Sequence, residues 1–402
     1  MAQLKVVIDQ LNQRNSIPAS LPDPDSIVGV VNNGYTFQGT LVGAADIPNS
    51  ALGTWYVDTN NFYYWGGGLV DLDGGDTNTV VNSGGNDQDE IVSGPNPGRG
   101  DMTPEPTNSI ILSLQINKIW ELNETGQNAI VAILDSGIAL NCPDLSDAVG
   151  NGVNGGLASA GFRMKTFIEG DVSVNDDIGH GSHCAGLIAS RNTEQSIGIA
   201  KGCSLYVGKI VNASTDFSAS TIISGIRWAA GLDDGSPQDI DIISLSGGSL
   251  LNVPDMQPTI EEALSKGKIL VFSIGNRDPL SLPQGGTYPA LFDEVISVGA
   301  IDFENVFQDY SYQSSNLTIA CPGTGILSYW LQGDTNTVKG TSQAAAICSG
   351  VIALLVSKLK KKGFNAKEIQ DKIKKALLSS PTSSINEYTY RYLTPLQLYE
   401  SL

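Results

Sequence analysis

From about residue 115 onward, short runs of apolar residues alternate with stretches that have helical spacing. The apolar runs are nearly continuous, which is typical of strands buried on both faces of a mostly parallel sheet. They comprise residues 129–134, 205–210, 240–245, 269–274 and 295–300. Helical spacing is found over 219–230 and 259–264, and a longer helical run covers 343–361. The pattern predicts an α/β domain of three layers with a mostly parallel central sheet and functional residues at strand C-terminal ends.

The N-terminal part of the chain has a different pattern. It is rich in strand formers and turns: residues 34–42 alternate as a strand, and the aromatic runs 54–57 and 62–65 predict a hairpin. A later stretch of Gly, Asp, Asn, Ser and Pro has too few apolar residues to order itself. The predicted organisation is a small β-rich domain over 1–70, a linker over 71–108 and the α/β domain over 109–402.

Composition and charge narrow the classes of partner. The 402 residues are 41% hydrophobic and 16% charged, as in a folded globular chain. A formal net charge of −19 argues against nucleic acid or an anionic membrane as a partner. No stretch is expected to reach the roughly 18–20 apolar residues of a membrane span. We therefore predict neither a nucleic-acid nor a membrane partner.

The cysteines and the N-terminus indicate a compartment. The five cysteines are odd in number and widely spaced, and they lie in apolar surroundings, so we expect buried free thiols. The first residues lack a charged segment followed by a long apolar run, so no conventional signal peptide is predicted. Both observations favour a reducing, cytoplasmic location, and export by another route stays an alternative.

Three glycine-flanked motifs carry the candidate chemistry. Asp135 follows an apolar strand directly, so its carboxylate is expected to lie buried at the strand end, where it can accept a histidine ring N–H. His180, between two glycines, can take a hydroxyl proton near neutral pH. Ser342 opens the long helical run, where the helix dipole favours a developing oxyanion. Singly, each has an ordinary structural explanation: a turn, a buried histidine or a helix cap.

The order of the motifs, and the choice between two histidines, sharpen the interpretation. The sequence has only two histidines, His180 and His183, and both lie in one motif. Two histidines three residues apart suggest zinc, but the sequence offers no convincing third ligand, so no catalytic metal is expected. The chain order Asp, His, Ser is one of the three known orders of the hydrolytic triad.

With these motifs, residues from about 110 to 395 resemble the catalytic domain of the subtilisin-like serine proteases, or subtilases. The resemblance implies that Asp135 orients the base, that His180 is the general base and then acid, and that Ser342 is the nucleophile of a serine endopeptidase. It implies that Asn276 donates its side-chain amide to the oxyanion, together with the Ser342 backbone N–H. It further implies a substrate-binding set that comprises Ser246, Gly247, Gly248, Ser273 and Gly275.

The sequence departs from the family pattern near the site and at the N-terminus. Gln343 replaces the usual Met after the nucleophile, Ala346 replaces a Pro, and Arg277-Asp278 replaces an acidic-glycine pair. No catalytic group is removed, but specificity is expected to change. The compact propeptide of secreted relatives is not recognisable in the first 107 residues. These residues are expected to occlude the cleft, recruit a substrate or bind a partner.

The remaining expectations concern ligands and alternatives. The partner is a protein or peptide substrate, and the enzyme either turns over many proteins or processes one dedicated partner. No cofactor is expected to be required; structural calcium is frequent in the family, and the acidic stretch 171–177 could supply ligands. The alternative function is a catalytically inactive, protease-like scaffold whose N-terminal module binds a partner or carbohydrate.

Overall fold

A computed structural model describes the chain in two parts. The first comprises seven strands between residues 2 and 71; the second comprises residues 107–146, 148–149, 163–191, 198–277 and 285–402. The chain also divides by compactness into two units, one N-terminal and one that begins at Asp89. Most of the predicted linker lies outside the described residues, so the proposed domain boundaries stay predictions.

The N-terminal strands form one antiparallel sheet in the order β3-β2-β6-β5-β4-β1-β7. The strands are β1 (Ala2–Val6), β2 (Gln10–Arg14), β3 (Ile27–Asn32), β4 (Thr36–Leu41), β5 (Trp55–Asp58), β6 (Tyr63–Trp65) and β7 (Leu69–Asp71). The predicted pairing of the two aromatic runs is confirmed, because β5 and β6 pair antiparallel with Trp55 opposite Trp65. The single strand predicted over 34–42 corresponds to β4.

The second unit is built on a seven-stranded parallel sheet in the order β14-β13-β12-β11-β8-β10-β9. Its strands are β8 (Ile130–Asp135), β9 (Met164–Thr166), β10 (Ser204–Lys209), β11 (Ile242–Leu245), β12 (Ile269–Ser273), β13 (Ile296–Ile301) and β14 (Ile319–Pro322). The five predicted strands are confirmed. The two edge strands, β9 and β14, were not predicted, because β9 contains the polar residues Lys165 and Thr166 and β14 ends at Pro322, so neither gives a continuous apolar run.

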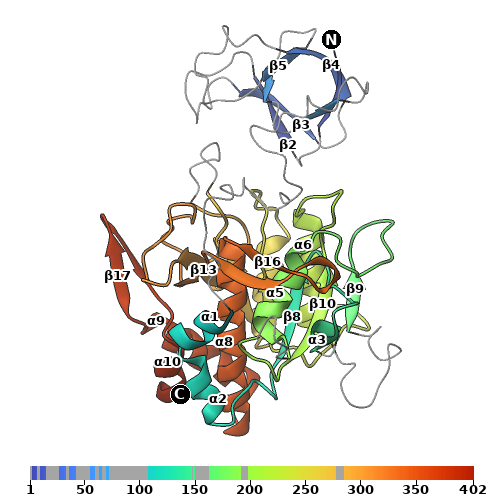
Figure 1. Cartoon of the computed structure of the whole chain (residues 1–402). Coiled ribbons are helices and arrows are strands. Elements are labelled where there is room, and N and C mark those ends of the chain that lie inside the picture. The colour runs from blue at the N-terminus through green and yellow to red at the C-terminus, as the bar shows by residue number, and fades with distance from the viewer. Residues whose placement is uncertain are drawn as a thin grey trace. The chain divides into compact units, whose positions relative to one another are not determined.

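Two hydrophobic clusters, one on each face, make this unit a three-layer structure. Along β8, Val131 and Ile133 belong to one cluster, and Ala132 and Leu134 to the other, as the alternation of a strand requires. The first face is covered by α5 (His180–Ala189) and α8 (Thr341–Lys361), and the second by α6 (Ala219–Ala230) and α7 (Met256–Ser265) (Figure 1). The predicted three-layer α/β architecture is therefore confirmed.

Further helices and two hairpins complete the unit around this sheet. They are the helices α1 (Thr107–Ser113), α2 (Ile116–Glu121), α3 (Pro143–Ser146), α9 (Ala366–Leu378) and α10 (Pro395–Ser401), the 3₁₀ turn η7 (Leu331–Gly333), and the hairpins β15 (Ile326–Tyr329) with β16 (Thr335–Val338) and β17 (Thr382–Ile385) with β18 (Tyr388–Arg391).

Helix α8 is the central helix of the apolar core. Contrary to the sequence-based expectation, its length and hydropathy do meet the requirements of a membrane span. However, 94% of its apolar window is buried inside the unit, and the helix packs against α5 and strands β11 to β14. Its hydrophobicity is therefore explained by the core, because a helix that is apolar all round is suited to the interior of a large domain.

Candidate active site

Asp135 and His180 meet where β8 ends and α5 begins. Asp135 is the last residue of β8 and is fully buried, and His180 is the first residue of α5. Their Oδ1 and Nδ1 atoms are 2.7 Å apart. The same carboxylate oxygen accepts the backbone N–H of Ser136, also at 2.7 Å, whereas Oδ2 has no hydrogen-bond partner in the described structure. Because a carboxylate only accepts, Nδ1 carries the proton and Nε2 is left free to act as a base.

The two histidines have opposite electrostatic environments. Burial alone would lower the pKa of His180, but the attraction of Asp135 and Asp176 outweighs it and raises the pKa above 6.5. Burial, with the nearby His180, lowers the pKa of His183 to about 3. The His183 Nε2 atom lies 3.1 Å and 3.2 Å from the carbonyl oxygens of Ile326 and Asn336. His183 is thus a neutral histidine that ties α5 to the β15–β16 hairpin.

Asp176 is a buried carboxylate that links the segment that contains Asp135 to the segment that contains His180. The sequence interpretation did not assign it this role. Its Oδ1 accepts from Ser136 Oγ at 2.8 Å and from the Gly179 N–H at 2.9 Å. Its Oδ2 accepts from Ser182 Oγ at 2.6 Å and from the Ser182 N–H at 2.8 Å. Asp176 therefore fixes the loop after Asp135 to the first turn of the helix that carries His180. Its place four residues before that histidine was the only signal in the sequence.

The glycines around His180 are required by close contacts. A Cβ atom on Gly181 would lie 2.3 Å from the carbonyl oxygen of Gly137. Gly179 has a φ of +99° and packs against the Trp330 ring, with only 2.4 Å between a built Cβ and the nearest ring atom. Glycine is the residue that allows both the left-handed conformation and the approach of another segment. The glycine-flanked pattern thus reflects the packing that positions the histidine.

Ser342 is held against the predicted substrate-binding segment. It is the second residue of α8 and is 3% exposed; the capping position is Gly340, so Ser342 is not the helix cap. Its Oγ donates to the Ser246 carbonyl oxygen at 2.9 Å, and Ser246 Oγ donates to the Ser342 carbonyl oxygen at 3.1 Å. No hydrogen bond joins Ser342 Oγ to His180, whose Nε2 has no partner among the described residues.

Asn276 is anchored beside the start of α8. Its Oδ1 accepts from the backbone N–H of Thr341 at 2.9 Å and from Thr341 Oγ1 at 3.1 Å. Because a backbone N–H can only donate, these bonds fix the orientation of the amide and leave Nδ2 as a donor. Nδ2 lies beside Gly340, 3.3 Å from the position a Cβ would take there. The donor therefore faces the segment that leads into Ser342.

The predicted substrate-binding residues lie on two neighbouring segments that follow β11 and β12. The Phe217 ring packs against Gly247, where a Cβ atom would lie 2.5 Å from the nearest ring atom. Gly248 and Gly275 both pack against the Thr287 side chain. A Cβ atom on Gly248 would lie 2.4 Å from the nearest atom of that side chain, and one on Gly275 would lie 2.9 Å from it. Ser273, the last residue of β12, is buried. Ser246 exchanges hydrogen bonds with Ser342, and Gly275 directly precedes Asn276, so the two segments lie beside these two residues.

Possible cation ligands near the site are already engaged. Ligand atoms of Asp135, His180 and Cys184 lie within 4.8 Å of one another, but the Asp–His hydrogen bond accounts for two of these groups. In the acidic stretch 171–177, Asp171 and Asp177 form ion pairs with Lys209 at 3.3 Å and 3.2 Å. Calcium in that stretch would have to compete with the buried ammonium, so these contacts give the suggestion no support.

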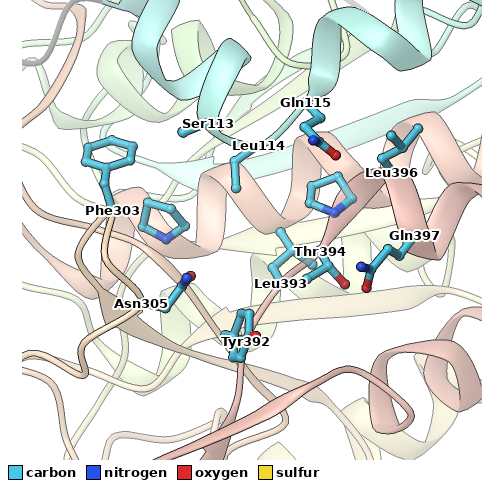
Figure 2. A pocket seen from close by; sticks show the side chains of 12 residues that line it. Ser113, Leu114, Gln115, Phe303, Asn305, Tyr392, Leu393, Thr394, Leu396 and Gln397 are labelled. Carbon is cyan, nitrogen blue, oxygen red and sulfur yellow. The ribbon is translucent and has the colours of Figure 1, made fainter.

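A pocket apart from these residues has no comparable chemistry. It has a volume of about 150 Å³ and lies between the corner that joins α1 to α2, Phe303 and the segment that leads into α10 (Figure 2). None of its lining residues is charged, and none is histidine or cysteine. The titratable groups suited to acid–base chemistry are therefore at the Asp135–His180 site and not in this pocket.

Comparison with known proteins identifies the class. The model of the subtilase family matches residues 126–391, well over half of the chain. The chain therefore belongs to the subtilase family, and the expected resemblance is confirmed. Subtilisin DY of Bacillus licheniformis is 30% identical over 246 residues, which cover 61% of this chain and 82% of that protein. The major intracellular serine protease of Bacillus subtilis (strain 168) is 31% identical over 249 residues, 60% of this chain and 72% of the relative.

A third relative extends the intracellular group. The intracellular serine protease of Paenibacillus polymyxa is 31% identical over 246 residues, which cover 60% of this chain and 70% of that protein. These relatives support serine protease activity in general terms for this chain.

Proposed function

We propose that the protein is a serine endopeptidase that hydrolyses peptide bonds through an acyl-enzyme, with Asp135, His180 and Ser342 as its triad. The observation that carries the proposal is the buried Asp135–His180 hydrogen bond of 2.7 Å, which leaves Nε2 free to take a proton. Family membership supports the chemistry, and the position of Ser342 at the start of α8 supports its role as nucleophile.

In the proposed reaction, Ser342 Oγ leaves the Ser246 carbonyl and transfers its proton to His180 Nε2 as it attacks the scissile carbonyl. Asp135 stabilises the imidazolium that forms. His180 then protonates the leaving amine, and water hydrolyses the acyl-enzyme by the reverse proton path. Asn276 Nδ2 and the Ser342 N–H stabilise the oxyanion, and the positive end of α8 adds to their effect.

The test is covalent labelling with a fluorophosphonate, which reacts with an activated serine. We expect the full-length protein to be labelled, and tryptic mass spectrometry to place the adduct on Ser342. An unreactive, folded protein would instead support the alternative, a catalytically inactive scaffold whose N-terminal module binds a partner or carbohydrate. Labelling at another residue would contradict the assignment of the nucleophile.

Replacing Asn276 with Leu tests the proposed oxyanion donor. The variant removes Nδ2 near Ser342, and we expect kcat to fall by about 10²–10³ with KM nearly unchanged; that figure comes from a donor in another member of this family. Thr341→Ser is the matched control, because its hydroxyl can still donate to Asn276 Oδ1, and it should retain most activity. A loss that appears mainly in KM would show that Asn276 binds the substrate and does not stabilise the transition state.

The proposal extends to substrate and location. A protein or peptide is the substrate, and we favour dedicated processing of a partner in the cytoplasm. All five cysteines are free and buried, as the sequence predicted for the thiols, and burial raises the pKa of the Cys203 thiol to about 12. Two relatives are named as intracellular proteases. For residues 1–107, we propose substrate recruitment or occlusion of the cleft, which a deletion of residues 1–106 would test by its effect on proteolysis.

A further inference from the structure

The β15–β16 hairpin lies against α5, the helix that carries His180 (Figure 1). Ser328 Oγ donates a hydrogen bond to the His183 carbonyl oxygen at 2.8 Å. Three residues further along the helix, Gly186 packs so closely against Ser328 that a Cβ atom would lie 2.3 Å from the same hydroxyl oxygen. Together with the bonds of the His183 ring to both strands, these contacts hold α5 firmly to the hairpin.

Trp330 directly follows β15 and packs on the residue that precedes His180. Among the described residues, the three atoms nearest to a Cβ built on Gly179 all belong to the Trp330 ring, at 2.4, 2.5 and 2.7 Å. The Trp330 ring also meets the His183 ring edge to face, with 6.0 Å between the two centroids. Trp330 therefore contacts α5 at its N-cap and in its first turn.

The start of α5 has no side-chain cap of its own. Its N-cap is Gly179, which has a left-handed φ of +99°. The N–H of this glycine donates to Asp176 Oδ1 at 2.9 Å, and its carbonyl oxygen accepts from the His183 N–H at 2.9 Å. Because glycine has wide conformational freedom, packing against the Trp330 ring is needed to limit its motion. The backbone at His180 is therefore fixed by hydrogen bonds and by this packing together.

The same hairpin leads directly to the proposed nucleophile. Two residues separate the end of β16, Val338, from Thr341, the first residue of α8. The turn that joins the two strands is closed by the Trp330 N–H, which donates to the Asp334 carbonyl oxygen at 2.7 Å. The hairpin is thus in contact with the helix that carries the base and is continuous with the helix that carries Ser342.

We propose that Trp330 is a positioning residue of the active site: its ring fixes the start of α5 and, with it, the placement of His180 relative to Ser342. The inference rests on the proposed function. Trp330 acts through Gly179 and not on the substrate, so its loss should affect the catalytic step more than substrate binding. Because a misplacement of about 1 Å can cost about 10²-fold in rate, the ring should matter for kcat and little for KM.

The test compares Trp330→Ala with the conservative Trp330→Phe in the full-length protein, below the thermal transition of each variant. In Trp330→Ala we expect kcat for a fluorogenic peptide to fall roughly 10–10²-fold with KM within about twofold of wild type, and Trp330→Phe should recover most of the loss. The rate of fluorophosphonate labelling should fall by a similar factor, because labelling needs the same base but no bound peptide.

Another half-buried tryptophan provides the matched control. Trp120 lies on α2, and its Nε1 donates to the Ile199 carbonyl oxygen at 3.0 Å. Trp120→Ala removes an indole of similar burial that does not pack on Gly179, so kcat should stay nearly unchanged. If Trp330→Ala does not fold, Trp330→Leu replaces it, with an expected kcat below that of Trp330→Phe.

A double-mutant cycle with Gly179 tests the contact itself. Gly179→Ala places a Cβ atom against the Trp330 ring at a left-handed φ, so kcat should fall. In the Trp330→Ala background the same exchange should lower kcat by a smaller factor, because the close contact is gone and backbone strain alone remains. Additive losses would show that the contact does not position the base.

Three further outcomes would overturn the proposal: a kcat in Trp330→Ala equal to that of wild type, a loss that appears mainly in KM, or an equal loss in Trp120→Ala. Failure of the proposed function is distinguishable from these. In that case the wild type takes up no fluorophosphonate label, whereas failure of this inference alone leaves wild type and Trp330→Ala labelled at the same rate.

Discussion

Ser342→Ala is expected to reduce kcat by about 10⁶, and His180→Ala by a similar factor, as for the corresponding groups in another subtilase. The double variant should be no slower than either single one, because the nucleophile and its base act as one unit. Steady-state kinetics with a fluorogenic peptide, after removal of contaminating activity with an inhibitor, measures the loss. Additive losses in the double variant would contradict the proposed proton transfer.

A second buried serine on the same helix provides the control for Ser342→Ala. Ser349 is fully buried in α8, and its Oγ donates to Ser244 Oγ at 2.8 Å. Ser349→Ala removes a hydrogen bond of similar kind, so we expect about 1 kcal/mol of lost stability with kcat nearly unchanged. An equal loss of activity in both variants would indicate a structural role for Ser342.

Asp135→Asn is expected to reduce kcat by up to about 10⁴, the loss known where the same exchange also gives the wrong histidine tautomer. This exchange removes the charge of residue 135 but can keep its hydrogen bonds. His180 Nδ1 and the Ser136 N–H both bind Oδ1, and Oδ2 has no described partner. An amide can keep its oxygen in that place, so the histidine tautomer is retained while the stabilisation of the imidazolium is lost.

The pH dependence provides a signature for this loss of charge. His180 must be neutral to act as the base, so activity should fall as the pH decreases through its pKa, which lies above 6.5 in the wild type. Without the Asp135 charge, the effect of burial dominates and the pKa of His180 falls. The acidic limb of kcat/KM should therefore move to lower pH in Asp135→Asn. An unmoved limb would show that another group controls it.

Local patterns in the sequence were sufficient to predict the parallel sheet and much of the candidate site. The five inner strands of the parallel sheet, helix α6 and the buried carboxylate at the end of β8 follow from apolar runs and their boundaries. Contacts between distant segments do not leave such a pattern. Examples are Asp176 with Ser136 and Ser342 with Ser246, whose partners are 40 and 96 residues apart. These bonds depend on the assembled tertiary structure.

The order of strands in the parallel sheet has a consequence for how the chain folds. Val131 of β8 lies opposite Leu205 of β10 on one side and Ile242 of β11 on the other. The central ladder can therefore close only after long intervening segments have been brought together, at a large cost in chain entropy. Refolding should be slow, and α8 should expose its apolar surface meanwhile. Assistance that shields this helix would raise the yield of active enzyme.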